Sequence, residues 1–318
     1  MMDADTPQME FGTRLSAQLT VLGAIDQDGR DPVYIVWHHG AWCPMACKII
    51  RTPSKLQREA DILSALAHPN IVRCLGIDGS QHLLMEFLEG PTLSKAQRDR
   101  PKGWSGISDA MRVAIHLGAA LQHIHERGFV HMDVKASNVI LVHGRPVLFD
   151  FGIARLQDEP RPARYAGTYP YMAPEECLCE PVTPAADVFG LGVTIYKLLT
   201  GRLPFPEGTP DDPHPQVGQA PTSARYYRRA IPARLDDLIL GCLERDPASR
   251  PRLAVLIPTL HDFIRTGPPM WPQGFCPTDD VGTGRIIHNR EGTPVASNPE
   301  VATPPSSAGS IRGQQPLP

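Results

Sequence analysis

The sequence predicts an α+β fold in which strands concentrate near the N-terminus and helices follow. Residues 15–50 contain three short runs rich in β-forming side chains, and such runs bounded by Gly, Asp and Pro are typical of antiparallel strands. Residues 107–127 place apolar side chains at every third or fourth position, which predicts an amphipathic helix. A chain of 318 residues with 42% apolar side chains fits one large domain or two small ones.

Charge and hydropathy argue against several classes of partner. The net charge is −3 and the pI about 6.5, so no basic field favours nucleic acid or anionic lipid. No apolar run reaches the roughly 18 residues that a membrane span needs, and the acidic N-terminus lacks the apolar core of a signal peptide. We therefore expect no nucleic-acid partner, no membrane span and a cytoplasmic location.

The seven cysteines favour the same location. Their number is odd and most lie in apolar or helix-like runs, which indicates free thiols in a reducing compartment. Cys177 and Cys179 are too close in sequence for a usual zinc site, and no matching His/Cys set accompanies them. We expect no structural zinc.

Three strands are predicted after a flexible lead-in at residues 1–14, namely Leu15–Leu22, Val33–Trp37 and Met45–Ile50. A helix should follow them, because apolar residues at 56, 60, 63, 66 and 67 have helical spacing up to the His-Pro-Asn stretch at 68–70. These elements together predict a small sheet with one helix beside it.

Lys48 and Glu59 stand out in this part of the chain. Lys48 has small and apolar neighbours on the third strand, where an unpaired ammonium would lose its hydration without compensation. Glu59 lies beside the apolar stripe of the following helix and is the natural partner. The alternative is an exposed lysine and a solvated glutamate.

The segment His131–Asn138 contains one carboxylate, one ammonium and one amide within six residues. Two apolar runs follow, at 139–142 and 147–149, with a Gly/Pro-containing turn between them, and this pattern predicts a short hairpin. Such a hairpin would bring Asp133, Asn138 and Asp150 to one edge. Two carboxylates and an amide oxygen suit Mg²⁺, which prefers few protein oxygens together with substrate phosphates.

These motifs resemble those of the eukaryotic-like, or Hanks-type, protein Ser/Thr kinase family. The resemblance rests on His131–Asn138, which resembles the family's catalytic loop, on the Asp-Phe-Gly at 150–152 and on Gly167–Glu175, and these motifs recur in the family's order. It implies a bilobal kinase fold with a small β-rich N-lobe and a larger, mainly helical C-lobe. The implied boundaries are N-lobe 15–85, hinge 86–90 and C-lobe 91–264, together the kinase domain 15–264. Residues 265–318 are rich in Pro, Gly, Ser and Thr with little apolar periodicity, so their composition predicts a disordered Pro-rich tail.

The resemblance also implies roles for the catalytic residues. Asp133 would accept or orient the proton of the attacking hydroxyl, and Lys135 would reach the γ-phosphate of ATP. Lys48 would grip the α- and β-phosphates, with Glu59 fixing the lysine. A lysine at position 135 is the pattern of Ser/Thr kinases, so the implied activity is transfer of the ATP γ-phosphate to Ser/Thr hydroxyls of protein substrates.

The resemblance implies metal-binding, substrate-binding and nucleotide-binding roles for further residues. Asn138 and Asp150 would hold Mg²⁺, with Mn²⁺ as an alternative. Thr168 would hydrogen-bond Asp133 and Lys135 and shape the pocket next to the acceptor residue. The implied ATP-binding residues, besides Lys48, are Leu22, Gly23, Val33, Ala46, Met85, Glu86, Leu88 and Ile140.

Three residues of the larger lobe have implied structural roles. Asp187, in a predicted buried helix, would be an unpaired carboxylate unless it bonded the backbone of the catalytic loop. Glu175 and Arg250 correspond to the family's buried ion pair between the activation segment and a late helix.

Two departures from the family pattern produce hypotheses. Met132 replaces the arginine that normally binds an activation-segment phosphate, and residues 153–167 contain no Ser or Thr. We therefore expect activity that does not depend on Ser/Thr phosphorylation there, with Tyr165 as the only hydroxyl candidate.

The second departure is the connection at residues 23–32, which has only Gly23 and Gly29 and places three aspartates where a triphosphate should lie. It is either an ATP-covering turn with outward carboxylates or an ordinary hairpin without a ligand. For that reason a pseudokinase scaffold with weak or absent turnover is the alternative function. A small-molecule phosphotransferase is disfavoured by the Ala-Pro-Glu at 173–175 and by Arg250.

Overall fold

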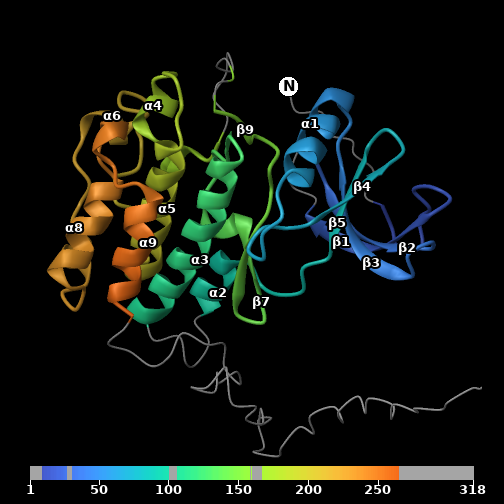
Figure 1. Ribbon diagram of the computed structural model, residues 1–318, viewed down its shortest axis with the longest axis horizontal. Helices are drawn as coiled ribbons and strands as arrows, with labels where there is room; N and C mark the ends of the chain where they lie inside the picture. Colours follow the sequence, from blue (N-terminus) through green and yellow to red (C-terminus); the bar gives the residue numbers. More distant parts are fainter. Residues whose placement is uncertain (1–8, 27–30, 100–105, 158, 160–166, 265–318) are drawn as a thin grey trace, which may run out of the picture. The chain divides into compact units, whose positions relative to one another are not determined.

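The described chain consists of an antiparallel sheet followed by a mainly helical part, as the sequence predicted (Figure 1). The structure is a computed structural model, and it describes residues 9–26, 31–99, 106–157, 159 and 167–264. The expected disordered tail, most of the expected flexible lead-in, and the residues Gly29 and Tyr165 lie outside the described residues.

Five strands form one sheet in the order β1-β2-β3-β5-β4, with every neighbouring pair antiparallel. Helix α1, Pro53–Ser64, packs against β4 and β5 (Figure 1). One side of the sheet buries a small apolar cluster that includes Val21, Tyr34 and Val36. The strands are β1 Leu19–Asp26, β2 Val33–His38, β3 Cys43–Ile49, β4 Cys74–Asp78 and β5 His82–Glu86.

The first strand differs from the predicted Leu15–Leu22. β1 begins only at Leu19 because the chain before it turns, with the Leu15 N–H donating to the Leu19 carbonyl at 3.0 Å. β1 then continues to Asp26, which pairs with Val33, and two register shifts accompany this extension. The start of the connection predicted at residues 23–32 is therefore strand.

Helix α1 ends at Ser64, earlier than the predicted end at residues 68–70. The chain beyond it turns toward the larger lobe, where the Asn70 amide donates to the Pro146 carbonyl at 2.7 Å. Leu66 stays buried in this turn. The apolar periodicity therefore continues past the end of the helix, because the turn faces the same core.

The larger lobe is built around α3, Ile107–Glu126, whose bounds agree with the predicted helix at 107–127. α3 packs against α5, Ala185–Thr200, and α9, Leu253–Asp262 (Figure 1). Gly118 permits the close approach of α9, since a Cβ there would lie 2.9 Å from Ile257 Cγ1. The other helices are α2 Leu93–Asp99, α4 Pro174–Cys177, α6 Pro215–Gly218, α7 Ala224–Tyr227 and α8 Ala233–Cys242, with 3₁₀ turns η1 Ala136–Asn138, η2 Tyr169–Tyr171 and η3 Pro247–Ser249.

Two short ribbons complete the larger lobe. β7, Val139–Val142, and β8, Arg145–Leu148, form the predicted hairpin, and β6, Phe129–Val130, pairs with β9, Arg155–Leu156. The Pro-rich stretch at 206–222 contains the single-turn helix α6. Among the described segments, no helix is long and apolar enough to cross a bilayer.

Candidate active site

Lys48 joins the sheet, helix α1 and the larger lobe at one point. Its Nζ lies 2.8 and 3.1 Å from the two Glu59 carboxylate oxygens and 2.9 Å from Asp150 Oδ1. Burial alone would lower the pKa of Lys48, but the two carboxylates outweigh that effect and raise it. Burial likewise acts to raise the pKa of Asp150, and Lys48 outweighs it and lowers that pKa. The ammonium and the Asp150 carboxylate therefore both stay charged at neutral pH.

Asp133 is held on one side by two partners. Its Oδ2 accepts hydrogen bonds from Lys135 Nζ at 2.6 Å and from Asn138 Nδ2 at 2.9 Å. Asn138 Nδ2 also donates to the Asp133 carbonyl. The second carboxylate oxygen, Oδ1, is buried and has no hydrogen-bond partner among the described residues. A buried, unpartnered carboxylate oxygen is a strong acceptor site for an incoming donor.

Asp187 fixes the chain just before Asp133. Its carboxylate accepts the backbone N–H groups of His131 at 2.9 Å and Met132 at 2.8 Å, and the His125 ring at 2.8 Å. Burial would raise the pKa of Asp187, but the hydrogen bond and charge of His125, together with His131, outweigh it and lower that pKa. Met132 has a φ of 68°, an uncommon conformation for a non-glycine residue. The bond to its N–H helps to hold this turn.

Asn138 directly precedes β7 and Asp150 follows β8, so both lie at the open base of the hairpin. Their side chains supply oxygens suited to a divalent cation. The Phe149 N–H donates to the Asn138 carbonyl at 3.0 Å, which closes the hairpin base between them. Because the Asn138 amide nitrogen is bound to Asp133, its amide oxygen is directed away from Asp133. The Asp150 side chain is 41% exposed. One amide and one accessible carboxylate oxygen fit a hard cation that also binds phosphates.

Thr168 meets the catalytic loop through Lys135, whose Nζ donates to the Thr168 hydroxyl. A direct Thr168–Asp133 bond, which the sequence also led us to expect, is not among the described contacts, and Lys135 bridges the two residues instead. This bridge places the activation segment against the loop that carries Asp133.

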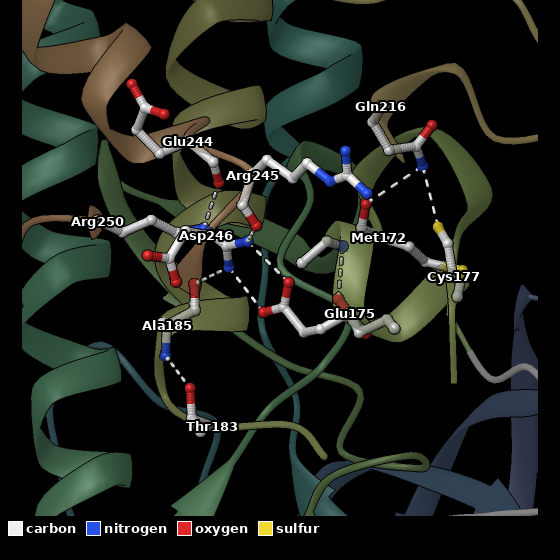
Figure 2. A network of polar contacts seen from close by, with 12 residues as sticks. Met172, Glu175, Cys177, Thr183, Ala185, Gln216, Glu244, Arg245, Asp246 and Arg250 are labelled. Carbon is white, nitrogen blue, oxygen red and sulfur yellow. Dashed lines mark hydrogen bonds and ion pairs between the residues drawn. The ribbon is translucent and has the colours of Figure 1, made fainter. Parts of the chain in front are cut away.

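Glu175 and Arg250 form a two-pronged ion pair (Figure 2). Arg250 Nη1 lies 2.7 Å from Glu175 Oε1, and Nη2 lies 2.7 Å from Oε2. The guanidinium also donates to the carbonyls of Ala185, Glu244 and Arg245. Both side chains are essentially buried. The N–H groups of the guanidinium thereby all donate to oxygens, and these oxygens come from three separate segments of the chain.

The residues predicted to bind the nucleotide lie on adjacent strands and beside them. Ala46 pairs with Met85 across β3 and β5, and Val33 pairs with Lys48 across β2 and β3. The other predicted nucleotide-binding residues lie nearby in the sequence of elements. Leu22 and Gly23 belong to β1, and Glu86 ends β5 with Leu88 just beyond it. Ile140 belongs to β7.

The hinge approaches the hairpin closely at Gly90. A Cβ at this position would lie 2.2 Å from the Leu141 carbonyl oxygen, and the φ of 155° is also rare for other residues. The Leu141 N–H donates to the Pro91 carbonyl at 3.0 Å. Only glycine therefore permits the predicted hinge, 86–90, to lie against β7.

The acidic connection between β1 and β2 adds negative charge on the side of Glu59. Burial raises the pKa of Glu59 against the opposing effect of Lys48, and the charges of Asp150 and, last, Asp31 add to that rise. Negative charge at this point opposes a triphosphate. Asp28 and Gly29 lie outside the described residues.

Sequence reasoning missed several residues that organise the site. Arg58 donates to Glu159 and to the Ala154 carbonyl, joining α1 to the activation segment. Gln216, buried in α6, donates to Cys177 Sγ and to the Met172 carbonyl (Figure 2). These partners are far apart in sequence, and polar residues beside apolar stripes carry no signal that identifies a distant partner.

Comparisons with known proteins agree with this geometry. A protein-family model described as "Protein kinase domain" matches residues 31–260. The serine/threonine-protein kinase PkaA of Streptomyces coelicolor is 37% identical over 205 residues, covering 61% of this chain and 37% of that protein. The serine/threonine-protein kinase Pkn1 of Myxococcus xanthus is 34% identical over 253 residues, covering 71% and 35%.

A solved structure has the same fold. The kinase domain of Mycobacterium tuberculosis PknI superposes with a TM-score of 0.63 at 24% identity, covering 80% of this chain and 99% of that one. The chain spans only 35% to 40% of the length of the first relatives it matches. Since the family model covers most of the described chain, the chain belongs to the protein kinase domain family. Members of that family use ATP with a divalent metal.

Proposed function

We propose that the chain is a protein serine/threonine kinase that transfers the γ-phosphoryl group of ATP to Ser or Thr hydroxyls of protein substrates. The observation that carries this proposal is the Asp133 carboxylate. One oxygen is held by Lys135 and Asn138, and the other is buried without a partner among the described residues. A carboxylate fixed in this way can accept the hydrogen bond of an incoming hydroxyl.

The other charged residues act by position and charge, which is most of what phosphoryl transfer requires of a protein. Lys135 lies between Asp133 and Thr168, and its positive charge would reach the γ-phosphate as it is transferred. Lys48, held by Glu59, offers its ammonium to the α- and β-phosphates. We assign the whole activity to residues 15–264, with the lobes meeting at 86–90.

The divalent metal is Mg²⁺ in this proposal, with Mn²⁺ as an alternative. Asn138 and Asp150 would hold it, and the bound metal would offset phosphate charge. The contribution of the chain is to fix these two groups. The Asn138 amide is oriented by Asp133, and Asp150 is kept ionised by Lys48.

We further propose that activity does not require Ser/Thr phosphorylation of the activation segment. Met132 is apolar and nearly buried, so it offers no cation to a phosphate. A carboxylate of the chain itself, Glu159, contacts Arg58 instead. This pair joins the activation segment to α1 without a modification.

The proposed location is the cytoplasm, and nucleic acid is not a proposed partner. All six cysteines in the described part of the chain are free, as expected in a reducing compartment. Burial raises the pKa of Cys47 and of Cys242 to about 12, so both remain protonated thiols at neutral pH.

A pseudokinase scaffold is the second candidate, and the observation in its favour is the acidic connection after β1, which carries Asp26 and Asp31 and opposes a triphosphate there. Phosphotransfer to a generic protein substrate separates the two candidates. We expect activity in the wild-type chain and a loss of about 10²–10⁴-fold in Asp133→Asn, because the acceptor oxygen for the hydroxyl proton is weakened. Asp237→Asn, an exposed change in α8, is the matched control. Wild-type activity no higher than that of Asp133→Asn would favour the scaffold.

A further inference from the structure

One face of α5 supports the catalytic loop, and this face ends in a lysine. Asp187 binds the backbone before Asp133. On the next two turns, a Cβ at Gly190 would touch Val134, and the Thr194 hydroxyl donates to the Val134 carbonyl at 3.2 Å. Lys197 continues the same face, since positions 187, 190, 194 and 197 follow helical spacing. It stands about 5 Å, roughly one turn, beyond Thr194 along the helix.

Two neutral contacts hold the Lys197 ammonium in place. Its Nζ donates to the Tyr171 hydroxyl at 3.1 Å and lies 5.6 Å from the centroid of the Tyr171 ring. The Lys197 carbonyl accepts a bond from Gln97 of α2, which fixes the backbone. No carboxylate in the described part of the chain forms an ion pair with Lys197. The side chain is half-buried, so it has lost part of its hydration without gaining an anion.

A continuous series of contacts connects this ammonium to the proposed catalytic carboxylate. Tyr171 ends the turn η2 that begins after Thr168, and its N–H donates to the Thr168 carbonyl at 2.8 Å. The Thr168 hydroxyl accepts from Lys135, which binds Asp133. An acceptor residue placed on Asp133 would therefore lie at one end of this series of contacts, and the Lys197 ammonium lies at the other.

We infer that Lys197 is a specificity-determining residue that selects protein substrates with an anionic side chain, a carboxylate or a phosphate, close to the acceptor Ser or Thr. The inference rests on the proposed kinase function. A fixed, partly desolvated ammonium attracts an anion more strongly than a fully hydrated one. It repels a cation for the same reason, so the site discriminates in both directions.

Lys197 also lies in the last turn of α5, where a cation interacts favourably with the helix dipole. A purely structural role of that kind would change melting temperature in every variant lacking the charge. It would leave the choice between acidic and neutral peptides unaltered. Substrate selection is therefore the readout that separates the two roles.

The test uses the full-length protein and peptides with one fixed serine. Asp, Lys or phosphoserine is placed at each flanking position in turn, and kcat/KM is compared with that of a neutral parent peptide. We expect at least one position where Asp is preferred by about fivefold, the size of a single partly exposed ion pair. Preference for phosphoserine over Asp there would identify phosphate as the natural anion.

Lys197→Glu should move the preference at that position from Asp to Lys, and Lys197→Arg should keep it for Asp. Arg234→Glu, exposed in the first turn of α8, makes the same change in net charge and should leave the preference as in the wild type. Phosphorylation of all peptides without any charge preference, or equal preferences in wild type and Lys197→Glu, would overturn the inference. No phosphorylation of any peptide or protein would instead refute the proposed function.

Discussion

Arg250 shows how one residue can hold several segments together. Its guanidinium binds the Glu175 carboxylate with two bonds and also three backbone carbonyls, and it lies 5.0 Å from the centre of the Phe189 ring. Each partner depends on the same charge. Removing the arginine would leave a buried carboxylate and unsatisfied carbonyls at once.

We expect Arg250→Ala to be strongly destabilised. Breaking a buried ion pair on one side costs about 3–5 kcal/mol, because the remaining charge stays buried without a partner. Denaturant unfolding followed by fluorescence measures the loss directly. Arg252→Ala, an exposed arginine two residues away, is the control and should be near neutral. Wild-type stability in Arg250→Ala would show that the ion pair does not support the fold.

The residues of the candidate site could be predicted from the sequence where a motif specified them. The motifs indicated Lys48, Glu59, Asp133, Asn138 and Asp150, and the structure brings them together in two adjoining clusters. Their catalytic roles remain predictions. Partners outside the motifs, such as the His125 ring on Asp187, could not be assigned, because a histidine has several equally plausible contacts in a helical lobe.

At the scale of elements, α1 is held from both sides. Glu59 faces Lys48 in the sheet, and the preceding residue, Arg58, reaches the activation segment. Arg58 donates to both Glu159 oxygens and to the Ala154 carbonyl. The hydrogen bond from Arg58 lowers the pKa of Glu159, so the pair is ionised at neutral pH. The position of α1 is thus coupled to the chain that follows Asp150.

We predict that Arg58→Gln lowers kcat/KM for phosphotransfer by roughly fivefold with little loss of stability. The Arg58 side chain is 43% exposed, and pairs of that kind contribute about 1 kcal/mol or less. Steady-state kinetics and thermal unfolding measure the two quantities. The charge swap Arg58→Glu with Glu159→Arg should recover part of the activity.

Mass spectrometry of the active protein tests whether activity requires phosphorylation of the activation segment. We expect full activity in molecules that carry no phosphate between residues 153 and 167. If activity appeared only after phosphorylation of this segment, the Arg58–Glu159 pair could not replace the contact of an activation-segment phosphate.

Element boundaries were predicted best where periodicity was long. α3 spans 20 residues with a continuous apolar stripe, so its limits were nearly correct. β1 was misplaced because Leu15 belongs to a turn whose composition also suits a strand. α1 was extended too far because Leu66 remains buried after the helix has ended. Periodicity reports which residues face the core, and it does not report where helical hydrogen bonding stops.

At the scale of the whole described domain, Lys48 is one of the residues that link the lobes. It connects β3 with Asp150, 102 residues away in sequence, by a 2.9 Å contact. Sequence could predict that both residues belong to one site, but only through the family resemblance. The distance between them depends on the packing of two lobes, which local patterns do not encode. Ligand binding at this junction should therefore stabilise both lobes together.

We predict that ATP with Mg²⁺ raises the melting temperature of the wild-type protein. A ligand at 100 times its Kd stabilises the folded state by about 2.7 kcal/mol, which corresponds to roughly 5–10 °C for a domain of this size. Chelation of the metal with EDTA should remove most of the rise. Asp150→Asn should abolish the metal-dependent part, because an amide replaces the carboxylate, whereas Asp237→Asn should respond as the wild type does. A wild-type protein whose melting temperature is unaffected by ATP and Mg²⁺ would contradict nucleotide binding at this junction.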